Sequence, residues 1–353
     1  MADGRFERAA SLVTGAQRAG AYPAAVVEVG HSDGPCWQFA CGRLTYDAGA
    51  RAAGLDTLFD LASLTKVIVT GSIAMRLVAR RRLLLDLPVD AALPDWRPAG
   101  GARMTVIDLL EHASGLMAWS DCFRRCTGAR EFVRDIARLP LEYAPRTRSG
   151  YSDLGFILLG LVLESAGEAP LDAQFAPWLG SGDLLFSPGA GHRARIAPTE
   201  HDATWRARLL VGEVHDENAY ALGGVAGHAG LFGTAPAVGA FARLVLRTVT
   251  GETALGPPWL LRRFLTRSRV PGSSRALAWD GMRPTSSCGR RLSPAAVGHT
   301  GFTGTSLWID PGRDLYVVLL TNRVHPARPA TAADGLARLR PALHDAVVDA
   351  LER

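Results

Sequence analysis

The sequence contains almost no lysine. Of its 39 basic residues only Lys66 is a lysine, and the other 38 are arginines. Arginine stays protonated at any physiological pH, whereas a buried lysine can lose its proton and act as a base. A chain rich in arginine is expected to keep a lysine where arginine cannot act, although a single lysine can also survive by composition alone. The residues around Lys66 decide between these two interpretations.

Cysteine is also scarce, and its spacing does not match the common metal motifs. An odd number of scattered cysteines favours reduced thiols, which are typical of the cytoplasm. The N-terminal residues show no positive segment followed by an apolar one, so no secretory signal is predicted. We therefore expect a cytoplasmic protein, or a periplasmic or extracellular one if a leader has been removed. The five cysteines are Cys36, Cys41, Cys122, Cys126 and Cys288.

The chain lacks both a strong excess of one charge and a long hydrophobic run. Its formal net charge is only +5 over 353 residues, and no dense basic segment supports binding to nucleic acid. The longest uncharged stretch, 219–242, contains six glycines and Pro236, so a membrane-spanning helix is not expected. We predict neither a nucleic-acid partner nor a membrane partner, and the sequence leaves the oligomeric state open.

What the sequence does contain is strand patterns near both ends and helical patterns between them. This order suggests a sheet completed by the two termini, with a helical insert. Apolar periodicity and turn residues predict each element. The predicted strands are 24–29, 36–40, 305–309 and 315–321, and the predicted helices are 6–19, 63–81, 105–111, 152–165, 238–248 and 331–351.

The only lysine follows a serine by three residues, in Ser63-Leu64-Thr65-Lys66. Residues three apart share one face of a helix, so the amine of Lys66 can reach the hydroxyl of Ser63. The partial positive charge at the start of a helix disfavours an ammonium there and helps the lysine act as a neutral base. A serine hydroxyl needs such a base to become a good nucleophile. The pair predicts nucleophilic catalysis by Ser63.

Two further motifs follow in order along the chain. They are Tyr151-Ser152-Asp153, near the middle, and His299-Thr300-Gly301, ahead of the C-terminal strands. With Ser-x-x-Lys at residues 63–66, the chain resembles the serine hydrolases of the class C β-lactamase-like and penicillin-binding protein family, in particular their D,D-carboxypeptidase and esterase branch.

This resemblance implies a fold of the α/β (α+β) class. In it, both termini form an antiparallel sheet flanked by helices, beside a mostly helical second region. We expect the sheet region to comprise residues 1–66 and 275–353, and the helical region residues 67–274. Together they would form one β-lactamase-like catalytic unit.

The resemblance also implies the roles of individual residues. Ser63 would form the acyl-enzyme, Lys66 would take its proton, and Tyr151 would act as a second base whose pKa falls beside Lys66. His299 belongs with these three among the predicted catalytic residues. The backbone N–H groups of Ser63 and Phe302 would stabilise the developing oxyanion. This chemistry needs only water, so neither a metal nor another cofactor is predicted.

Two positions depart from the usual motifs. Asp153 stands where an amide side chain is commonest, and His299 stands where a lysine is typical of efficient β-lactamases. A neutral imidazole would bind a carboxylate less strongly than an ammonium, and its charge would change near its reference pKa of about 6.5. We predict Asp153, Thr300 and Gly301 as substrate-binding residues. The two departures favour a peptidase or esterase over a potent β-lactamase.

A third dense cluster comprises the segment 212–219 and the glycine-rich segment 223–231. Its glycines allow close approach of a ligand to the backbone. We predict that Asp216 and His228 contact the substrate. The alternative is a metal site formed by the histidines and carboxylates of this cluster, which include His215 and Glu217, although the serine chemistry does not require one.

The sequence therefore predicts a serine hydrolase that acts on a small-molecule or peptide substrate through an acyl-enzyme. A D-alanyl-D-alanine-type carboxypeptidase or a related esterase is the favoured activity. The alternatives are a β-lactamase, a penicillin-binding sensor that is acylated without turnover, and a pseudoenzyme that only binds. His112, which follows the helix predicted at 105–111, is interpreted as a C-terminal capping residue of that helix.

Overall fold

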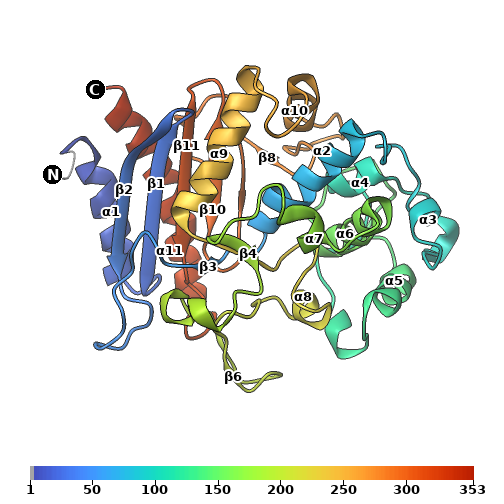
Figure 1. The fold of residues 1–353 in the computed structure, drawn as a ribbon, viewed down its shortest axis with the longest axis horizontal. Coiled ribbons are helices and arrows are strands. Elements are labelled where there is room, and N and C mark those ends of the chain that lie inside the picture. Colours follow the sequence, from blue (N-terminus) through green and yellow to red (C-terminus); the bar gives the residue numbers. More distant parts are fainter. Residues whose placement is uncertain (1–3) are drawn as a thin grey trace.

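The computed structural model describes residues 4–353, and its largest element is a six-stranded antiparallel sheet (Figure 1). Its strand order is β2-β1-β11-β10-β9-β8, so strands from the two ends of the chain pair directly at β1 and β11. The fold class predicted from the sequence is confirmed. The strands are β1 (Ala24–His31), β2 (Gly34–Gly42), β8 (Asp280–Gly281), β9 (Val297–Thr300), β10 (Ser306–Asp310) and β11 (Leu315–Thr321).

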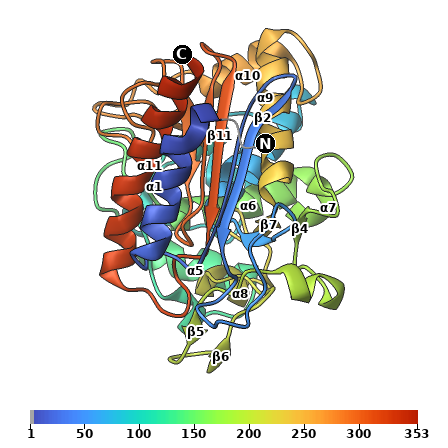
Figure 2. The ribbon, with the colours of Figure 1, turned by 90° about the vertical axis from the view of Figure 1, so that its left-hand side faces the viewer.

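Both faces of this sheet are buried. Successive side chains of a strand point to opposite faces, and in β11 Val317 packs into one hydrophobic core while Val318 packs into another. Helices α1 (Glu7–Arg18) and α11 (Ala330–Leu351) lie side by side on the face of Val317 (Figure 2). Helix α9 (Ala235–Thr250) covers the opposite face.

Helix α9 approaches the sheet closely because Gly239 has no side chain. A Cβ atom at this position would lie only 1.9 Å from Oε1 of the buried Glu28. Tyr316 OH donates a hydrogen bond of 2.8 Å to the same oxygen, and Arg243 of α9 forms an ion pair with it at 3.2 Å. Helix α9, which belongs to the segment 67–274, thus packs on the sheet. The proposed division into a sheet region and a helical region stays a prediction.

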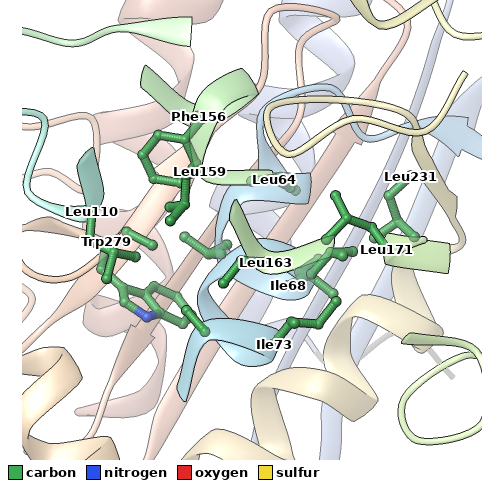
Figure 3. Close-up of a cluster of buried hydrophobic side chains, with 14 of the residues drawn as sticks. Leu64, Ile68, Ile73, Leu110, Phe156, Leu159, Leu163, Leu171, Leu231 and Trp279 are labelled. Atoms are coloured by element: carbon green, nitrogen blue, oxygen red, sulfur yellow. The ribbon is translucent and has the colours of Figure 1, made fainter. Parts of the chain in front are cut away.

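Helices α2 to α5 and α7 pack around α6 (Asp153–Gly167), which lies in the interior. Ser152 caps α6 by accepting a hydrogen bond from Gly155 N–H, and apolar residues surround almost the whole helix, as expected for a buried one. Figure 3 shows Phe156, Leu159 and Leu163 of α6 beside Leu64 and Ile68, which follow Ser63 in the chain. This packing brings the segment of Ser63 to the start of α6. The other helices are α2 (Ser72–Ala79), α3 (Val89–Ala92), α4 (Val106–Leu110), α5 (Ala129–Arg138), α7 (Leu171–Phe175), α8 (Glu217–Ala221) and α10 (Pro258–Leu265).

A small three-stranded sheet connects two loops that meet at the site. Its strand order is β3-β7-β4, and Leu61 N–H, directly after β3, donates a 2.9 Å hydrogen bond to Leu231 O. The segment before Ser63 is therefore bound to the end of the glycine-rich segment. A separate pair joins β5 (His201–Asp202) to β6 (Arg208–Leu209). The three strands of the small sheet are β3 (Phe59–Asp60), β4 (Leu184–Phe186) and β7 (Leu231–Gly233).

Most predicted elements are present, and β11 has the predicted bounds 315–321. The helix predicted at 63–81 differs, because residues 66–71 form a π-helical turn before α2 begins. Such turns are rare and often occur at functional sites. No helix within residues 4–353 is long and apolar enough to cross a membrane.

Candidate active site

A strained turn presents Ser63. The residue before it, Ala62, has a φ of +48°, which is unfavourable for a residue with a side chain. The buried carboxylate of Asp60 holds the turn, since Oδ1 accepts from Ala62 N–H at 2.8 Å and Oδ2 from His215 N–H at 2.7 Å. Burial raises the pKa of Asp60 although these bonds oppose the shift. Asp60 thus connects the turn of Ser63 to the segment of His215.

Lys66 lies within hydrogen-bonding distance of Ser63 and is completely buried. Its Nζ atom donates to Ser63 Oγ at 2.9 Å, to Asp153 Oδ1 at 2.6 Å and to the carbonyl oxygen of His228 at 2.9 Å. These three acceptors match the three protons of an ammonium. Burial nevertheless lowers the pKa of Lys66, against the opposing effect of Asp153. The lowered pKa supports the predicted role of Lys66 as a base.

Tyr151 contacts the same serine from the start of α6. Its hydroxyl lies 2.8 Å from Ser63 Oγ and donates to Asp153 Oδ1 at 2.8 Å. The predicted fall of the Tyr151 pKa is wrong: burial and the nearby carboxylate of Asp153 raise it well above the usual value for a phenol. Tyr151 therefore stays protonated, which suits a group that delivers or relays a proton rather than one that starts as an anion.

Asp153 is hydrogen-bonded to Lys66 and Tyr151 in addition to facing the cavity where a substrate would bind. Its Oδ1 atom accepts both hydrogen bonds. An amide at this position would place no negative charge beside the lysine. The substitution of aspartate for the usual amide therefore changes the electrostatics of the proton-transfer groups, and the substrate-binding role of Asp153 stays a prediction.

Two residues that the sequence did not assign to the site support Tyr151. The ring of His112 packs against that of Tyr151, with centroids 4.8 Å apart, and its Nδ1 atom accepts a 3.0 Å bond from Ser152 N–H. The guanidinium of Arg275 lies over the Tyr151 ring, 5.4 Å from its centroid. The interpretation of His112 as a helix cap is wrong, because its ring accepts a hydrogen bond from Ser152 N–H and binds no carbonyl of α4. No local sequence pattern indicated Arg275.

His299 is buried at the end of β9, with its ring centroid 6.1 Å from that of Tyr151. Its Nδ1 atom lies 2.8 Å from Thr300 O, and its buried Nε2 atom has no partner within the described residues. Burial, together with the positive charges of Arg275 and Lys66, lowers the pKa of His299 well below its reference value. The expectation that its charge changes near the reference pKa is therefore wrong, and His299 is neutral at pH 7.

The turn between β9 and β10 is bound directly to the segment before Ser63. Thr303 Oγ1 donates to Asp60 O at 2.7 Å, and Thr305 Oγ1 donates to Leu61 O at 2.9 Å. Gly301 allows this approach, because a Cβ atom there would lie 2.7 Å from Leu61 O. Neither threonine was predicted from the sequence, although both lie just beyond the third motif.

The two proposed oxyanion donors, the N–H groups of Ser63 and Phe302, belong to the two segments that these hydrogen bonds join. Within residues 4–353 no hydrogen bond uses the backbone N–H groups of Ser63 and Phe302. Both groups thus remain available to a substrate oxygen. Their role in catalysis stays a prediction.

Asp216 and His228 line the cavity next to Lys66. His228 Nε2 lies 2.7 Å from Asp216 Oδ1, and both side chains come from the segments 212–219 and 223–231. Burial alone would raise the pKa of Asp216, but the contact with His228 keeps it below its usual value. Contact with the substrate stays a prediction for both residues.

The alternative of a metal site in this cluster is not supported by the arrangement of its side chains. His215 pairs with Glu200 at 2.9 Å, and Glu217 pairs with Arg328 at 2.6 Å, so each potential ligand is used in a separate contact. Within residues 4–353 no three histidine, cysteine or acidic side chains are grouped so that they could hold a metal ion.

The site borders a cavity of about 940 Å³. Ser63, Tyr151, Asp216, His299 and Thr300 line it, as do Trp119 and several arginines. The exposed Phe302 lies between Arg323 and His215, whose groups stack on its ring. The cavity is large enough for a substrate of several residues and is open at the nucleophile.

The fold and this arrangement define a serine hydrolase that acts through an acyl-enzyme. Comparisons with known proteins agree: the model of the family described as Beta-lactamase matches residues 9–341. The chain belongs to this family.

Curated relatives include proteins named "Putative D-alanyl-D-alanine carboxypeptidase". The one from Escherichia coli (strain K12) is 31% identical over 304 residues, which cover 76% of this chain and 70% of the relative. The one from Salmonella agona (strain SL483) is 31% identical over 310 residues, covering 77% and 71% respectively.

Solved structures show the same fold at lower identity. EstCE1, described as a hydrolase with promiscuous acyltransferase activity, has a TM-score of 0.76 at 21% identity, with 98% of each chain covered. A penicillin-binding protein homologue from Caulobacter crescentus has a TM-score of 0.75 at 20% identity, again with 98% of each chain covered.

Proposed function

We propose that this protein is a D,D-carboxypeptidase that removes the last residue from peptides ending in D-alanyl-D-alanine. The observation that carries the proposal is the hydrogen-bonded group of Lys66, Ser63, Tyr151 and Asp153 at the base of the cavity. The name of the relatives from E. coli and Salmonella supports the substrate class.

Acylation begins when the Ser63 oxygen attacks the substrate carbonyl carbon and its proton passes to the neutral amine of Lys66. The electron pair of the carbonyl moves to its oxygen, where the N–H groups of Ser63 and Phe302 stabilise the negative charge. When the tetrahedral intermediate collapses, the C–N bond breaks and the leaving amine takes the proton of Tyr151. The ammonium of Lys66 then returns its proton to the Tyr151 phenolate, since both groups lie beside Ser63 Oγ.

Deacylation repeats these steps with water as the nucleophile. Water attacks the ester carbon, its proton passes to Lys66 or Tyr151, and the ester bond to Ser63 breaks as the serine oxygen regains a proton. The peptide acid leaves with a new carboxylate, and the enzyme returns to its starting protonation state.

The side chain of Arg275 supports a substrate with a free carboxylate near the scissile bond. Within residues 4–353 its guanidinium forms no hydrogen bond and no ion pair, and it lies over Tyr151, the group that serves the leaving amine. His299 is neutral and cannot supply this charge. A C-terminal carboxylate next to Arg275 would provide the missing partner and form a charge-assisted hydrogen bond.

We further propose that the protein acts in the cytoplasm on a soluble peptide. Cys41, Cys122, Cys126 and Cys288 are free thiols, which is typical of a reducing compartment. Fractionation of cells that express the protein at native level tests this location, and recovery in the periplasm or medium would overturn it.

The activity is tested by turnover of three acyl donors: a D-Ala-D-Ala peptide, p-nitrophenyl acetate and nitrocefin. We expect release of D-alanine with the highest kcat/KM, slower hydrolysis of the ester and the slowest turnover of nitrocefin. The Ser63→Ala variant should be inactive towards all three. Faster turnover of the uncharged ester would favour an esterase, faster turnover of nitrocefin a β-lactamase, and one equivalent of product without a steady rate an acylated sensor.

A further inference from the structure

Arg340, on helix α11, reaches the turn between β9 and β10 from the face of the sheet opposite α9. One of its guanidinium nitrogens donates to Gly301 O at 3.2 Å and to Thr305 O at 2.8 Å, while its buried Nε atom has no partner. Burial, and secondarily the charge of Arg323, lowers the pKa of Arg340 to about 10. The group is therefore a cation at pH 7, and no carboxylate pairs with it within residues 4–353.

The turn does not need Arg340 to satisfy its backbone. Gly304 N–H also donates to Gly301 O at 3.1 Å, and Gly301 N–H donates to Thr305 O at 2.7 Å. Each carbonyl thus keeps a hydrogen bond if the arginine is removed. Arg340 is partly buried and lines the cavity. A cation without a carboxylate partner is still costly there, and replacing such a charge by apolar groups is often neutral or stabilising. The stability of the fold is therefore a poor explanation for a charge at this position.

The peptide group between Gly301 and Phe302 offers a better explanation. Its oxygen accepts the hydrogen bond from Arg340, and its N–H is one of the two proposed oxyanion donors. The two ends of a peptide group share one resonance system, so a cation at the oxygen withdraws electron density from the N–H. Hydrogen bonds in series polarise one another in this way.

We propose that Arg340 is a positioning residue that strengthens and orients the Phe302 N–H as an oxyanion donor. The inference rests on the proposed acyl-enzyme chemistry at Ser63 but not on the identity of the peptide substrate. Negative charge on the substrate oxygen is largest in the transition state, so the charge of Arg340 acts mainly on kcat and little on ground-state binding.

The test uses Arg340→Met, which keeps the length of the side chain and removes its charge, and Arg340→Lys, which keeps a cationic donor. Arg338→Met, at an exposed position on the same helix, is the matched control. Acylation of each variant by p-nitrophenyl acetate is followed before the steady state, and thermal unfolding is measured in parallel. Isotope-edited infrared spectra of a 13C-labelled acyl-enzyme report hydrogen bonding to the ester carbonyl directly.

We expect Arg340→Met to slow acylation on the order of tenfold, less than the loss of a whole oxyanion donor, which costs roughly 10²–10³-fold. Its Tm should stay equal or rise, and the acyl carbonyl band should move to higher frequency. Arg340→Lys should recover part of the rate, and Arg338→Met should match the wild type. Activity and stability would then change in opposite directions, which a purely structural role does not predict.

Two results would overturn the inference. One is an Arg340→Met rate within twofold of the wild type with an unchanged carbonyl band. The other is that Arg340→Met and Arg340→Lys lose the same amount of rate and show the same decrease in Tm, which would show a packing role. If the wild type is not acylated at Ser63 by any activated donor, the proposed function itself fails, and this outcome differs from both.

Discussion

The two walls of the cavity contribute different kinds of chemical groups to the proposed reaction. The helical wall, formed by Lys66, Tyr151 and Asp153, presents hydrogen-bonded side chains around Ser63 that we propose to transfer its proton. The sheet wall, formed by residues 299–305 and supported by Arg340, presents backbone N–H groups and a neutral imidazole. Changes on the helical wall should therefore alter the pH dependence of the rate, whereas changes on the sheet wall should alter its magnitude at all pH values.

The largest effect is expected from Lys66→Arg on the helical wall. A guanidinium stays protonated and cannot accept the Ser63 proton, so kcat/KM should fall by about 10³-fold or more. Activity on the peptide and on p-nitrophenyl acetate should fall together. Circular dichroism and thermal unfolding check that the variant still folds, and a folded variant that keeps more than a tenth of the activity would exclude Lys66 as the base.

Arg275→Gln should separate substrates that carry a carboxylate from those that do not. Loss of one charge-assisted hydrogen bond corresponds to about 1.5–3 kcal/mol, so kcat/KM for the D-Ala-D-Ala peptide should fall by roughly 10–100-fold. The rate with p-nitrophenyl acetate should stay within about threefold. Arg269→Gln, at an exposed position nearby, is the control. Equal losses with both substrates would show that Arg275 acts on Tyr151 and not on the substrate.

On the sheet wall, Thr303→Val removes the hydrogen bond to Asp60 O and should let the turn move relative to Ser63. Small displacements at a reacting centre are costly, and we expect a decrease in kcat of about tenfold. The pH at which activity rises should not change. A shift of the pH profile would contradict the proposed division between the two walls.

Asp153→Asn gives the smallest change at the pH optimum and the clearest change in pH dependence. The carboxylate of Asp153 opposes the lowering of the Lys66 pKa, so its neutralisation should lower this pKa further. Since Lys66 acts as a base when neutral, the rise of kcat/KM with pH should move to lower pH. A rise that moves to higher pH, or a complete loss of activity, would indicate that Asp153 itself accepts the proton.

The sequence predicted the parts of the site that lie in short contiguous motifs. Ser63 and Lys66 are three residues apart, and Ser152 begins α6 where the apolar run begins. The strand β11 was equally clear, because a run of β-branched and apolar residues follows a turn.

The parts of the site that the sequence did not predict depend on contacts between segments far apart in the chain. Arg340 lies 39 positions from Gly301, and no local pattern distinguishes it from Arg338 of the same helix. The predicted direction of the Tyr151 pKa was wrong for a related reason. The prediction considered only a neighbouring lysine, whereas the folded chain also buries Tyr151 against His112 and beside the carboxylate of Asp153. Motifs therefore predict which groups form the site, whereas packing determines their protonation.

In the proposed reaction Ser63 carries the acyl group between the two walls. This role of Ser63 is tested by mixing the protein with a slow D-Ala-D-Ala analogue, quenching in acid and mapping the added mass by mass spectrometry. We predict that the acyl mass resides on the peptide containing Ser63, appears at the rate of D-alanine release and disappears on chase. Steady release of D-alanine without an acyl group on Ser63, or with one on another residue, would contradict this account.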